Sequence, residues 1–499
     1  MIPRSRVTRP RKPWTPVDTL ALIAVTVLGG AMRLARLDLP KAIVFDETYY
    51  AKDACFYLDL SQRVCGVESE QTLVHPPLGK WLIAGGIKLF DYDSFGWRFA
   101  AVLAGTITIA LLYLLARKVL SSTLGACIAS GLLAVDFLHF VQSRVAMLDI
   151  FVPMFGLAAL LFLLFDRDRL LRSPPSAARL VVRRPWRVAA GVATGMAVAS
   201  KWSGALFVVA AIVLTFVWEV AARRRRDDRR ALMGAVRAEG LSIAIALVLV
   251  PVAVYTLTYV GRLHGPTPTC EGATGSWANQ LVQHQKCMLD FHRNLEANHS
   301  YQSPPWSWLT LKRPVSYYFD TAPNGDYKEV LATGSPFVWW TSALALAFVA
   351  FRWTRRRDFA APEGTILAGF AFAYLPWLVL SSARSAVFLF YLLPAVPFMC
   401  LALGYVASRI GESWEARTAT ALFGVTGLGL FAFYYPLLAD VPLPREQWDK
   451  RIWVFDQCDR PEPETTSILT ETVGGRTRTR TTLRTGENAD LPPDGWCWI

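Results

Sequence analysis

Long apolar runs recur along the chain and alternate with polar segments. A run of about 17–20 apolar residues is needed to cross the hydrocarbon core of a membrane. By this criterion the sequence predicts about eleven transmembrane helices, the fifth of them short. The runs fall near residues 17–35, 97–117, 122–140, 146–165, 187–201, 203–222, 239–260, 335–352, 363–381, 386–407 and 418–437. The pattern therefore predicts an all-α polytopic membrane protein.

Arginine-rich connections predict the orientation of these helices, because short cytoplasmic loops are enriched in Arg and Lys. The odd number of spans puts the basic N-terminus and the connections at 167–187, 223–237 and 352–357 on one side, the expected cytoplasm. The C-terminus is then extracytoplasmic, and the membrane is expected to be the cell membrane. The first run has no clear cleavage site after it, so we expect an uncleaved anchor.

The same topology divides the chain into regions. Residues 1–16 form a cytoplasmic N-terminus, and 17–260 an N-terminal transmembrane module with a first exterior loop at 36–96. A large exterior loop follows at 261–334. The last two regions are a four-helix transmembrane module at 335–437 and an exterior tail at 438–499.

Six cysteines fall in the exterior segments, two in each, whereas Cys127 and Cys400 fall inside spans. Pairs of this kind in an oxidising compartment predict disulfides, and no CxxC spacing suggests zinc. The candidate pairs are Cys55 with Cys65, Cys270 with Cys287, and Cys458 with Cys497.

Composition agrees with a membrane protein and excludes other classes. The chain is 53% hydrophobic and 18% charged, against roughly 25% charged residues in soluble proteins. The net charge of +13 does not indicate nucleic-acid binding, because the Arg clusters lie between apolar spans rather than on one domain. No phosphate-binding loop or dinucleotide-binding motif is present.

Two adjacent carboxylates, Asp46 and Glu47, follow the first apolar run. Acids at a membrane surface beside aromatic residues suit proton abstraction from a hydroxyl, because partial desolvation raises their basicity. The alternative is that they only solvate a helix end.

Further polar residues lie near exterior span ends, where ionisable groups are costly and invite a functional hypothesis. Each has a structural alternative: a cation at a span end can snorkel to the headgroups, Arg144 and Asp149 can form an ion pair, and His75 can be a turn residue. Together they predict an exterior site for an anionic lipid headgroup. The set comprises Arg33, His75, Lys80, Arg98, Arg144, Asp149, Lys201, Trp202 and Arg384.

This combination suits transfer of a sugar from a lipid-linked phosphosugar. Arg and Lys neutralise the leaving phosphate, and one carboxylate deprotonates the incoming hydroxyl. Attack opposite the phosphate inverts the anomeric centre. No ligand cluster for a divalent metal is evident, so none is expected to be required, although a cation shared between Asp46 or Glu47 and the phosphate stays open.

Several runs, in this order, resemble the protein O-mannosyltransferases of glycosyltransferase family 39. The resemblance covers roughly residues 20–455. The runs are Arg33 to Glu47, His75-Pro76-Pro77-Leu78-Gly79-Lys80, Ser143-Arg144 to Asp149, Lys201-Trp202-Ser203-Gly204, Ser303-Pro304-Pro305-Trp306-Ser307-Trp308, Arg313-Pro314-Val315 and Phe388 to Pro394.

The resemblance implies a GT-C fold, a polyprenyl-phosphate-mannose donor, and Ser/Thr hydroxyls of secreted or membrane proteins as acceptors. It makes Asp46 the catalytic base, with Glu47 as its neighbour. Arg98 is the first candidate for the donor phosphate and Arg33 the second. Lys80, Lys201 and Arg384 are further candidates for donor binding, and His75, Arg144, Asp149 and Trp202 would support the site.

The chain departs from eukaryotic members in one respect. The exterior segment at 261–334 is too short for the MIR domain those enzymes carry there, which points to a bacterial, actinobacterial-type member and leaves acceptor recognition open. The Sec translocon is a candidate partner.

Two other classes of function stay open. A GT-C enzyme acting on a lipid or cell-wall glycan keeps the fold and changes the acceptor. A transporter or flippase would show related halves and a midplane site, whereas the polar residues here lie near the outer surface.

Overall fold

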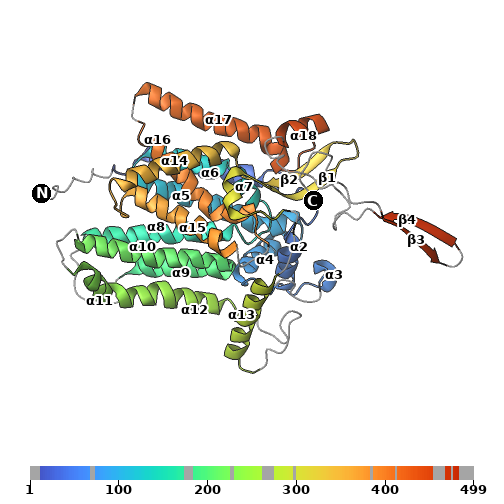
Figure 1. Cartoon of the computed structure of the whole chain (residues 1–499), viewed down its shortest axis with the longest axis horizontal. Coiled ribbons are helices and arrows are strands. Elements are labelled where there is room, and N and C mark those ends of the chain that lie inside the picture. The colour runs from blue at the N-terminus through green and yellow to red at the C-terminus, as the bar shows by residue number, and fades with distance from the viewer. Residues whose placement is uncertain are drawn as a thin grey trace.

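The fold is described from a computed structural model of the chain. It describes residues 12–67, 73–172, 184–224, 230–260, 275–295, 299, 301–381, 386–410, 413–452, 467–473 and 476–482. Long helices run side by side along the longest axis of the molecule (Figure 1). In the N-terminal part they are α1 (Pro16–Leu34), α5 (Ser94–Leu120), α6 (Thr123–Ala134), α8 (Phe151–Arg172), α9 (Pro185–Ser200), η2 with α10 (Trp202–Gly204, Ala205–Arg224), and α11, η3 and α12 (Ala231–Ala244, Ile245–Leu249, Val250–Leu257).

The C-terminal part continues the bundle with four further helical segments. These are α14 (Pro336–Thr354), α15 (Pro362–Leu380), η6 with α16 (Leu389–Ala395, Val396–Ala407) and α17 (Trp414–Leu438). Within the described residues, 8 helices are long and apolar enough to cross a membrane. The three other predicted spans are helices as well: α6 is a shorter apolar helix, α9 has 16 residues, and α8 carries Asp166, Arg167 and Asp168 near its end. The chain is a multi-pass membrane protein.

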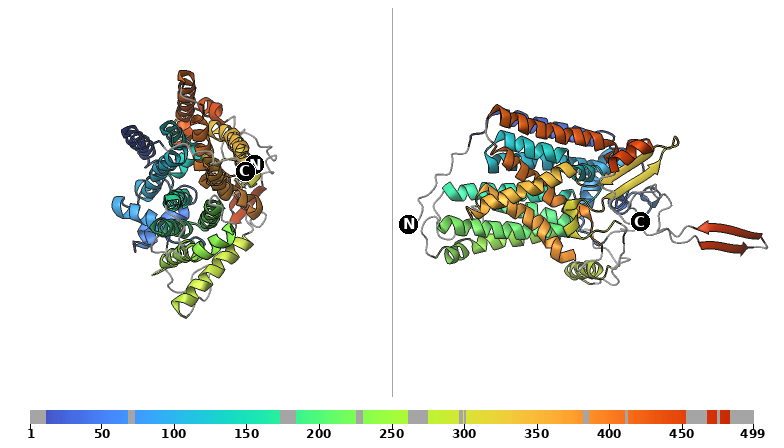
Figure 2. Two further views of the ribbon diagram at one scale, coloured as in Figure 1. Left: turned by 90° about the vertical axis from the view of Figure 1, so that its left-hand side faces the viewer. Right: turned by 45° about the horizontal axis from the view of Figure 1, so that its top comes forward.

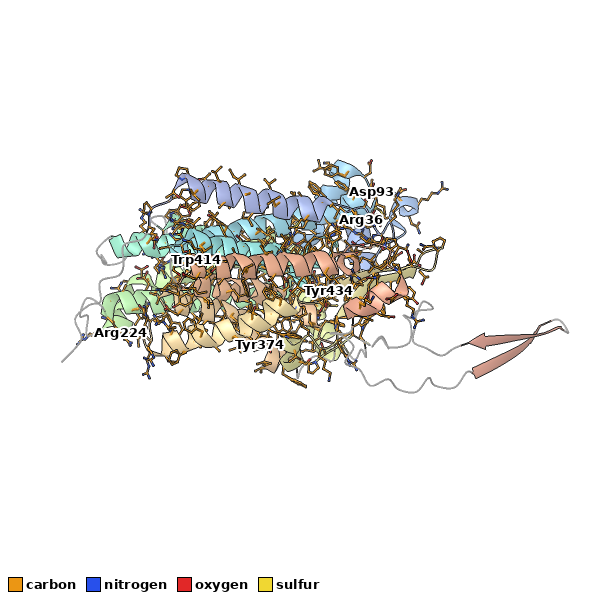
Figure 3. The ribbon with its side chains drawn as sticks, turned by 90° about the horizontal axis from the view of Figure 1, so that it is seen from above. Arg36, Asp93, Arg224, Tyr374, Trp414 and Tyr434 are labelled. Atoms are coloured by element: carbon orange, nitrogen blue, oxygen red, sulfur yellow. A yellow bond between two sulfur atoms is a disulfide. The ribbon has the colours of Figure 1, made fainter. Side chains whose placement is uncertain are left out.

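Short elements gather at one end of the bundle, where α2, α3, β1, β2 and α18 lie together (Figures 1 and 2). Arg36 and Asp93 lie near this end, whereas Arg224 lies at the opposite end (Figure 3). The short elements are α2 (Glu47–Phe56), α3 (Gln62–Cys65), α4 (Leu78–Phe90), α7 (Phe137–Gln142), α13 (Trp277–Asn294), η4 (Pro305–Thr310), β1 (Val315–Thr321), β2 (Tyr327–Ala332) and α18 (Arg445–Ile452). Strands β3 (Ser467–Val473) and β4 (Arg476–Thr482) pair antiparallel as a separate hairpin.

Side chains near the helix ends explain where several helices begin. Thr15 and Asp18 form a capping box at α1, the Asp93 side chain accepts from the Gly96 backbone N–H before α5, and Ser335 and Ser413 cap α14 and α17 in the same way. Each cap satisfies backbone donors that the first turn of a helix leaves unpaired.

Helix α5 lies at the centre of the bundle and packs against α1, α4, α6 and α8. A close approach also joins α9 to the π-helical turn η3, because a Cβ added at Gly191 would lie 1.8 Å from the Ala246 carbonyl oxygen. Glycine is therefore required at this crossing.

A buried ion network joins α8, α9, α10 and α11. The Arg184 guanidinium contacts Asp166 at 2.7 Å and Glu219 at 3.0 Å. Arg187 contacts the same Glu219 at 3.0 Å and Glu239 at 2.8 Å. Each charge has an opposite partner, which offsets the cost of removing it from water. The network fixes four helices to one another.

Cys55, near the end of α2, and Cys65, the last residue of α3, are joined by a disulfide. Cys287 on α13 is also disulfide-bonded, while its predicted partner Cys270 lies outside the described residues, as do Cys458 and Cys497. The two cysteines inside helices, Cys127 and Cys400, are free.

Candidate active site

Asp46 and Glu47 stand at the beginning of α2, directly after the loop that follows α1. The Asp46 carbonyl oxygen accepts from the backbone N–H groups of Tyr49 and Tyr50, which starts the helix. Its side chain makes no capping hydrogen bond and is partly exposed. Capping α2 therefore does not account for this carboxylate.

Glu47 is fully buried and points the other way, toward α5. Its two carboxylate oxygens accept from Arg98 Nε at 2.8 Å and Nη2 at 2.9 Å. The backbone N–H groups of Val44 and Ala146 donate to the same carboxylate at 3.0 and 2.9 Å. With four donors, this bidentate pair is satisfied inside the protein.

Arg98 uses its remaining capacity to hold the loop that leads to Asp46. Nη1 donates to the carbonyl oxygens of Leu37 at 3.2 Å and Pro40 at 2.8 Å, and Nη2 donates to that of Ala42 at 3.0 Å. All three guanidinium nitrogens thus have partners within the chain. Arg98 ties the loop before α2 to the central helix of the bundle.

Arg33 and Arg144 form a second basic cluster at the end of α1. Arg33 donates to the carbonyl oxygens of Gly29 at 2.9 Å and Ala134 at 3.1 Å, and lies 2.9 Å from His139 Nδ1. Arg144 donates to the carbonyl oxygens of Arg33 at 2.7 Å and Arg36 at 2.9 Å. Neither Arg33 nor Arg144 has a carboxylate partner among the described residues. The charges of these two guanidinium groups at the end of α1 are therefore not neutralised by an ion pair.

Lys80 and Lys201, by contrast, each bond to an acid. Lys80 Nζ lies 3.0 Å from Asp53 of α2. Lys201 Nζ lies 2.8 and 2.7 Å from the two oxygens of Asp149, and 4.9 Å from the ring centroid of Tyr391. The interpretation of Arg144 and Asp149 as an ion pair is therefore wrong, because Asp149 pairs with Lys201 and Arg144 bonds to the end of α1.

A cluster of aromatic side chains lies next to Asp46 in the structure. The Phe45 ring stacks on Tyr317 of β1 with centroids 4.6 Å apart, and meets the Phe390 ring edge-on at 6.0 Å. Gln142 Nε2 of α7 donates to the Tyr317 hydroxyl at 2.6 Å. Burial raises the pKa of Tyr317 well above its usual value, and the negative charges of Asp149 and Asp46 raise it further. Sequence reasoning missed Tyr317 and Gln142, since neither belongs to an ionisable cluster in the sequence.

His75 and Trp202 meet helix α13 at the edge of this region. The His292 ring lies 5.7 Å from the His75 ring and 5.7 Å from the Trp202 ring, between centroids. Trp202 Nε1 donates to the Tyr255 hydroxyl at 2.8 Å. These contacts attach α13 to the N-terminal module. The roles predicted for His75 and Trp202 stay predictions, and Arg384 lies outside the described residues.

A metal site is not evident in the part of the chain that the structure describes, where no group of three or more His, Cys, Asp or Glu could hold an ion. The prediction that no metal is required stays a prediction. What the arrangement offers chemically is a partly exposed carboxylate, Asp46, on a loop that the buried Glu47–Arg98 ion pair holds in place.

Comparison with known families gives two matches that together span most of the chain. A family described as dolichyl-phosphate-mannose-protein mannosyltransferase matches residues 23–97 and 93–264. The C-terminal four TMM region of protein-O-mannosyltransferase matches residues 277–456.

Individual proteins are similar over nearly the full length. The polyprenol-phosphate-mannose–protein mannosyltransferase of Mycobacterium tuberculosis (strain CDC 1551 / Oshkosh) is 32% identical over 88% of this chain and 91% of its own length. That of Corynebacterium glutamicum is 28% identical over 89% and 94%. In fold, the chain resembles the solved Saccharomyces cerevisiae Pmt1-Pmt2 protein O-mannosyltransferase complex bound to the sugar donor, with a TM-score of 0.72 at 16% identity, over 89% of this chain and 93% of that one. The fold is that of the GT-C glycosyltransferases, as the sequence predicted.

Proposed function

Because this chain belongs to the dolichyl-phosphate-mannose-protein mannosyltransferase family, we propose that it transfers mannose from polyprenyl-phosphate-mannose to Ser and Thr hydroxyls of exported proteins. The observation that carries the proposal is the pair of adjacent acids with different surroundings. Glu47 is buried against Arg98, while Asp46 stays partly exposed and does not cap α2. A partly exposed carboxylate at this position can act as a base.

The reaction balances without a further co-reactant. The acceptor hydroxyl gives its proton to the Asp46 carboxylate as its oxygen forms a bond to the anomeric carbon of mannose. The bond between that carbon and the phosphate oxygen breaks, and polyprenyl phosphate leaves with the electron pair. Because nucleophile and leaving group lie on opposite faces of the sugar, the configuration inverts.

Positive charge near the site would stabilise the leaving phosphate. Arg33 and Arg144 supply it in our proposal, since their hydrogen bonds go to carbonyl oxygens and a histidine rather than to carboxylates. Arg98 was the first candidate for direct phosphate contact. Its nitrogens donate within the chain, so we propose that it acts mainly by holding the loop before Asp46. Lys80, Lys201 and Arg384 remain candidates for donor binding.

We also propose that the end of the bundle carrying α2 faces the extracytoplasmic side of the cell membrane. Arg224, in one of the basic connections, lies at the opposite end from Arg36 and Asp93 (Figure 3), and basic connections favour the cytoplasm. The N-terminus is then cytoplasmic and the C-terminus extracytoplasmic. The Sec translocon, which exports proteins to this face, is then a candidate partner.

Purified protein tests this function directly. It should transfer radiolabelled mannose from polyprenyl-phosphate-mannose to a peptide containing Thr, and not to the same peptide with Ala in its place. EDTA in a parallel reaction should leave the rate unchanged. Transfer to lipid or glycan with none to the Thr peptide would instead support the alternative acceptor class.

A further inference from the structure

The strand β1 contains an extra residue beside the candidate active site. Val315 pairs with Ala332 and Ser316 with Leu331, but the next pair is Tyr318 with Val330. Tyr317 therefore has no partner across the hairpin. A bulge of this kind redirects one side chain out of the regular alternation and is frequent next to active sites.

The bulge turns the Tyr317 side chain into the protein, toward α7. The side chain is 4% exposed, its ring stacks on Phe45, and its edge meets Phe390 at 5.9 Å between centroids. Phe45 directly precedes Asp46, so the stack fixes the phenol beside the proposed base. The Lys201 ammonium lies 6.0 Å from the centroid of the same Phe390 ring. Tyr317 thus belongs to a cluster of rings that includes Phe45, the neighbour of Asp46, and Phe390, which lies near Lys201.

Two hydrogen-bonding groups, the Tyr317 O–H and Gln142 Oε1, have no hydrogen-bond partner among the described residues. The Tyr317 oxygen accepts from Gln142 Nε2, which leaves the phenol O–H without an acceptor. The other amide atom, Gln142 Oε1, is buried with no hydrogen-bond partner. A buried polar atom without a partner costs roughly 1–3 kcal/mol. A donor and an acceptor that both lack partners at one place suggest that a bound ligand group makes a hydrogen bond to each.

A sugar hydroxyl has the required chemistry, because one such group donates and accepts at once. The phenol serves it as a neutral donor: burial and the charges of Asp149 and Asp46 hold the pKa of Tyr317 well above the physiological range.

We propose that Tyr317 and Gln142 form a subsite that binds one hydroxyl of the donor mannose, with the Tyr317 O–H donating to it and Gln142 Oε1 accepting from it. This inference rests on the proposed function, since it names a sugar contact of the same site. It assigns substrate contact to two uncharged residues from β1 and α7.

The test compares Tyr317→Phe with wild type and with Tyr318→Phe. Tyr318 is a matched control, because its hydroxyl bonds to Asp320 on the same strand. We expect Tyr317→Phe to lose about 10- to 100-fold in kcat/KM for polyprenyl-phosphate-mannose, with the KM for the acceptor peptide unchanged. The loss should be the same from about pH 6 to pH 9, because a phenol with so high a pKa does not titrate there.

A set of monodeoxy-mannose donors identifies the contact. For the donor that lacks the bound hydroxyl, wild type and Tyr317→Phe should react at equal rates, since both lack the hydrogen bond. Gln142→Met should show the same pattern with the same donor. If Tyr317→Phe does not fold, the same comparison of donors with Gln142→Met tests the subsite.

The outcomes separate the two proposals. No mannose transfer by wild-type protein would reject the proposed function itself. Active wild type together with Tyr317→Phe at unchanged donor kinetics would overturn the subsite, with a water or internal packing then filling the gap. An equal loss with every deoxy donor would also overturn it.

Discussion

Asp46 and Glu47 are neighbours in sequence but have opposite surroundings. Glu47 is 0% exposed and accepts four hydrogen bonds, whereas Asp46 is partly exposed. The difference follows from the start of α2, which turns one side chain inward and leaves the other at the surface. The two acids therefore have different expected roles, a structural anchor and a base.

A substitution at Glu47 separates these roles. Glu47→Gln leaves Arg98 charged in a buried position without its counter-ion, which should cost about 3–5 kcal/mol. We expect a lower unfolding temperature in detergent and a fall in mannose transfer in proportion to the folded fraction. Arg98→Met should lower the unfolding temperature as well, because it also removes the donors to the carbonyl oxygens of Leu37, Pro40 and Ala42. An inactive Glu47→Gln protein with wild-type stability would instead place Glu47 in the chemistry.

The β1–β2 hairpin belongs to the proposed sugar subsite, and its second strand packs against α7 and α17. Its bulge positions Tyr317. Its second strand pairs with the segment after α17, through Tyr327 and Leu443. Glu329 of the same strand accepts from Trp448 Nε1 of α18 at 2.8 Å. The position of the hairpin therefore depends on residues 443–448, which follow the four-helix module.

Glu329 should make the docking of this hairpin sensitive to pH. Burial raises the pKa of Glu329 from 4.5 to about 8, so the folded protein keeps a proton that the unfolded chain releases. The stabilisation is complete below about pH 4.5 and is lost as the pH rises through about 8, at about 1.4 kcal/mol per pKa unit.

Thermal unfolding followed by Trp fluorescence checks this expectation. The wild-type unfolding temperature should fall between pH 5 and pH 9, and Glu329→Gln should flatten the dependence, because an amide has no proton to lose. An equal fall in both proteins would assign the pH sensitivity to other groups.

At the scale of the whole molecule, hydropathy was enough to predict a bundle of membrane helices, whereas the GT-C fold was implied by the resemblance of the motifs. The predicted spans correspond to helices throughout the described residues, because a membrane helix must carry its apolar length in its own sequence. Side-chain pairing could not be predicted in this way. Glu47 with Arg98, Lys80 with Asp53 and Lys201 with Asp149 join residues far apart in the chain, and the contribution of Tyr317 depends on a strand register that no local pattern specifies.

The most direct measurement is the rate of mannose transfer by purified Asp46→Asn, compared with Asp38→Asn. Asp38 is an exposed acid of the same loop, so the two changes remove the same charge a few residues apart. An amide cannot take up the acceptor proton, so transfer by Asp46→Asn should fall by at least about 100-fold, with the unfolding temperature and Asp38→Asn activity close to wild type. Wild-type transfer by folded Asp46→Asn would show that another group accepts the proton.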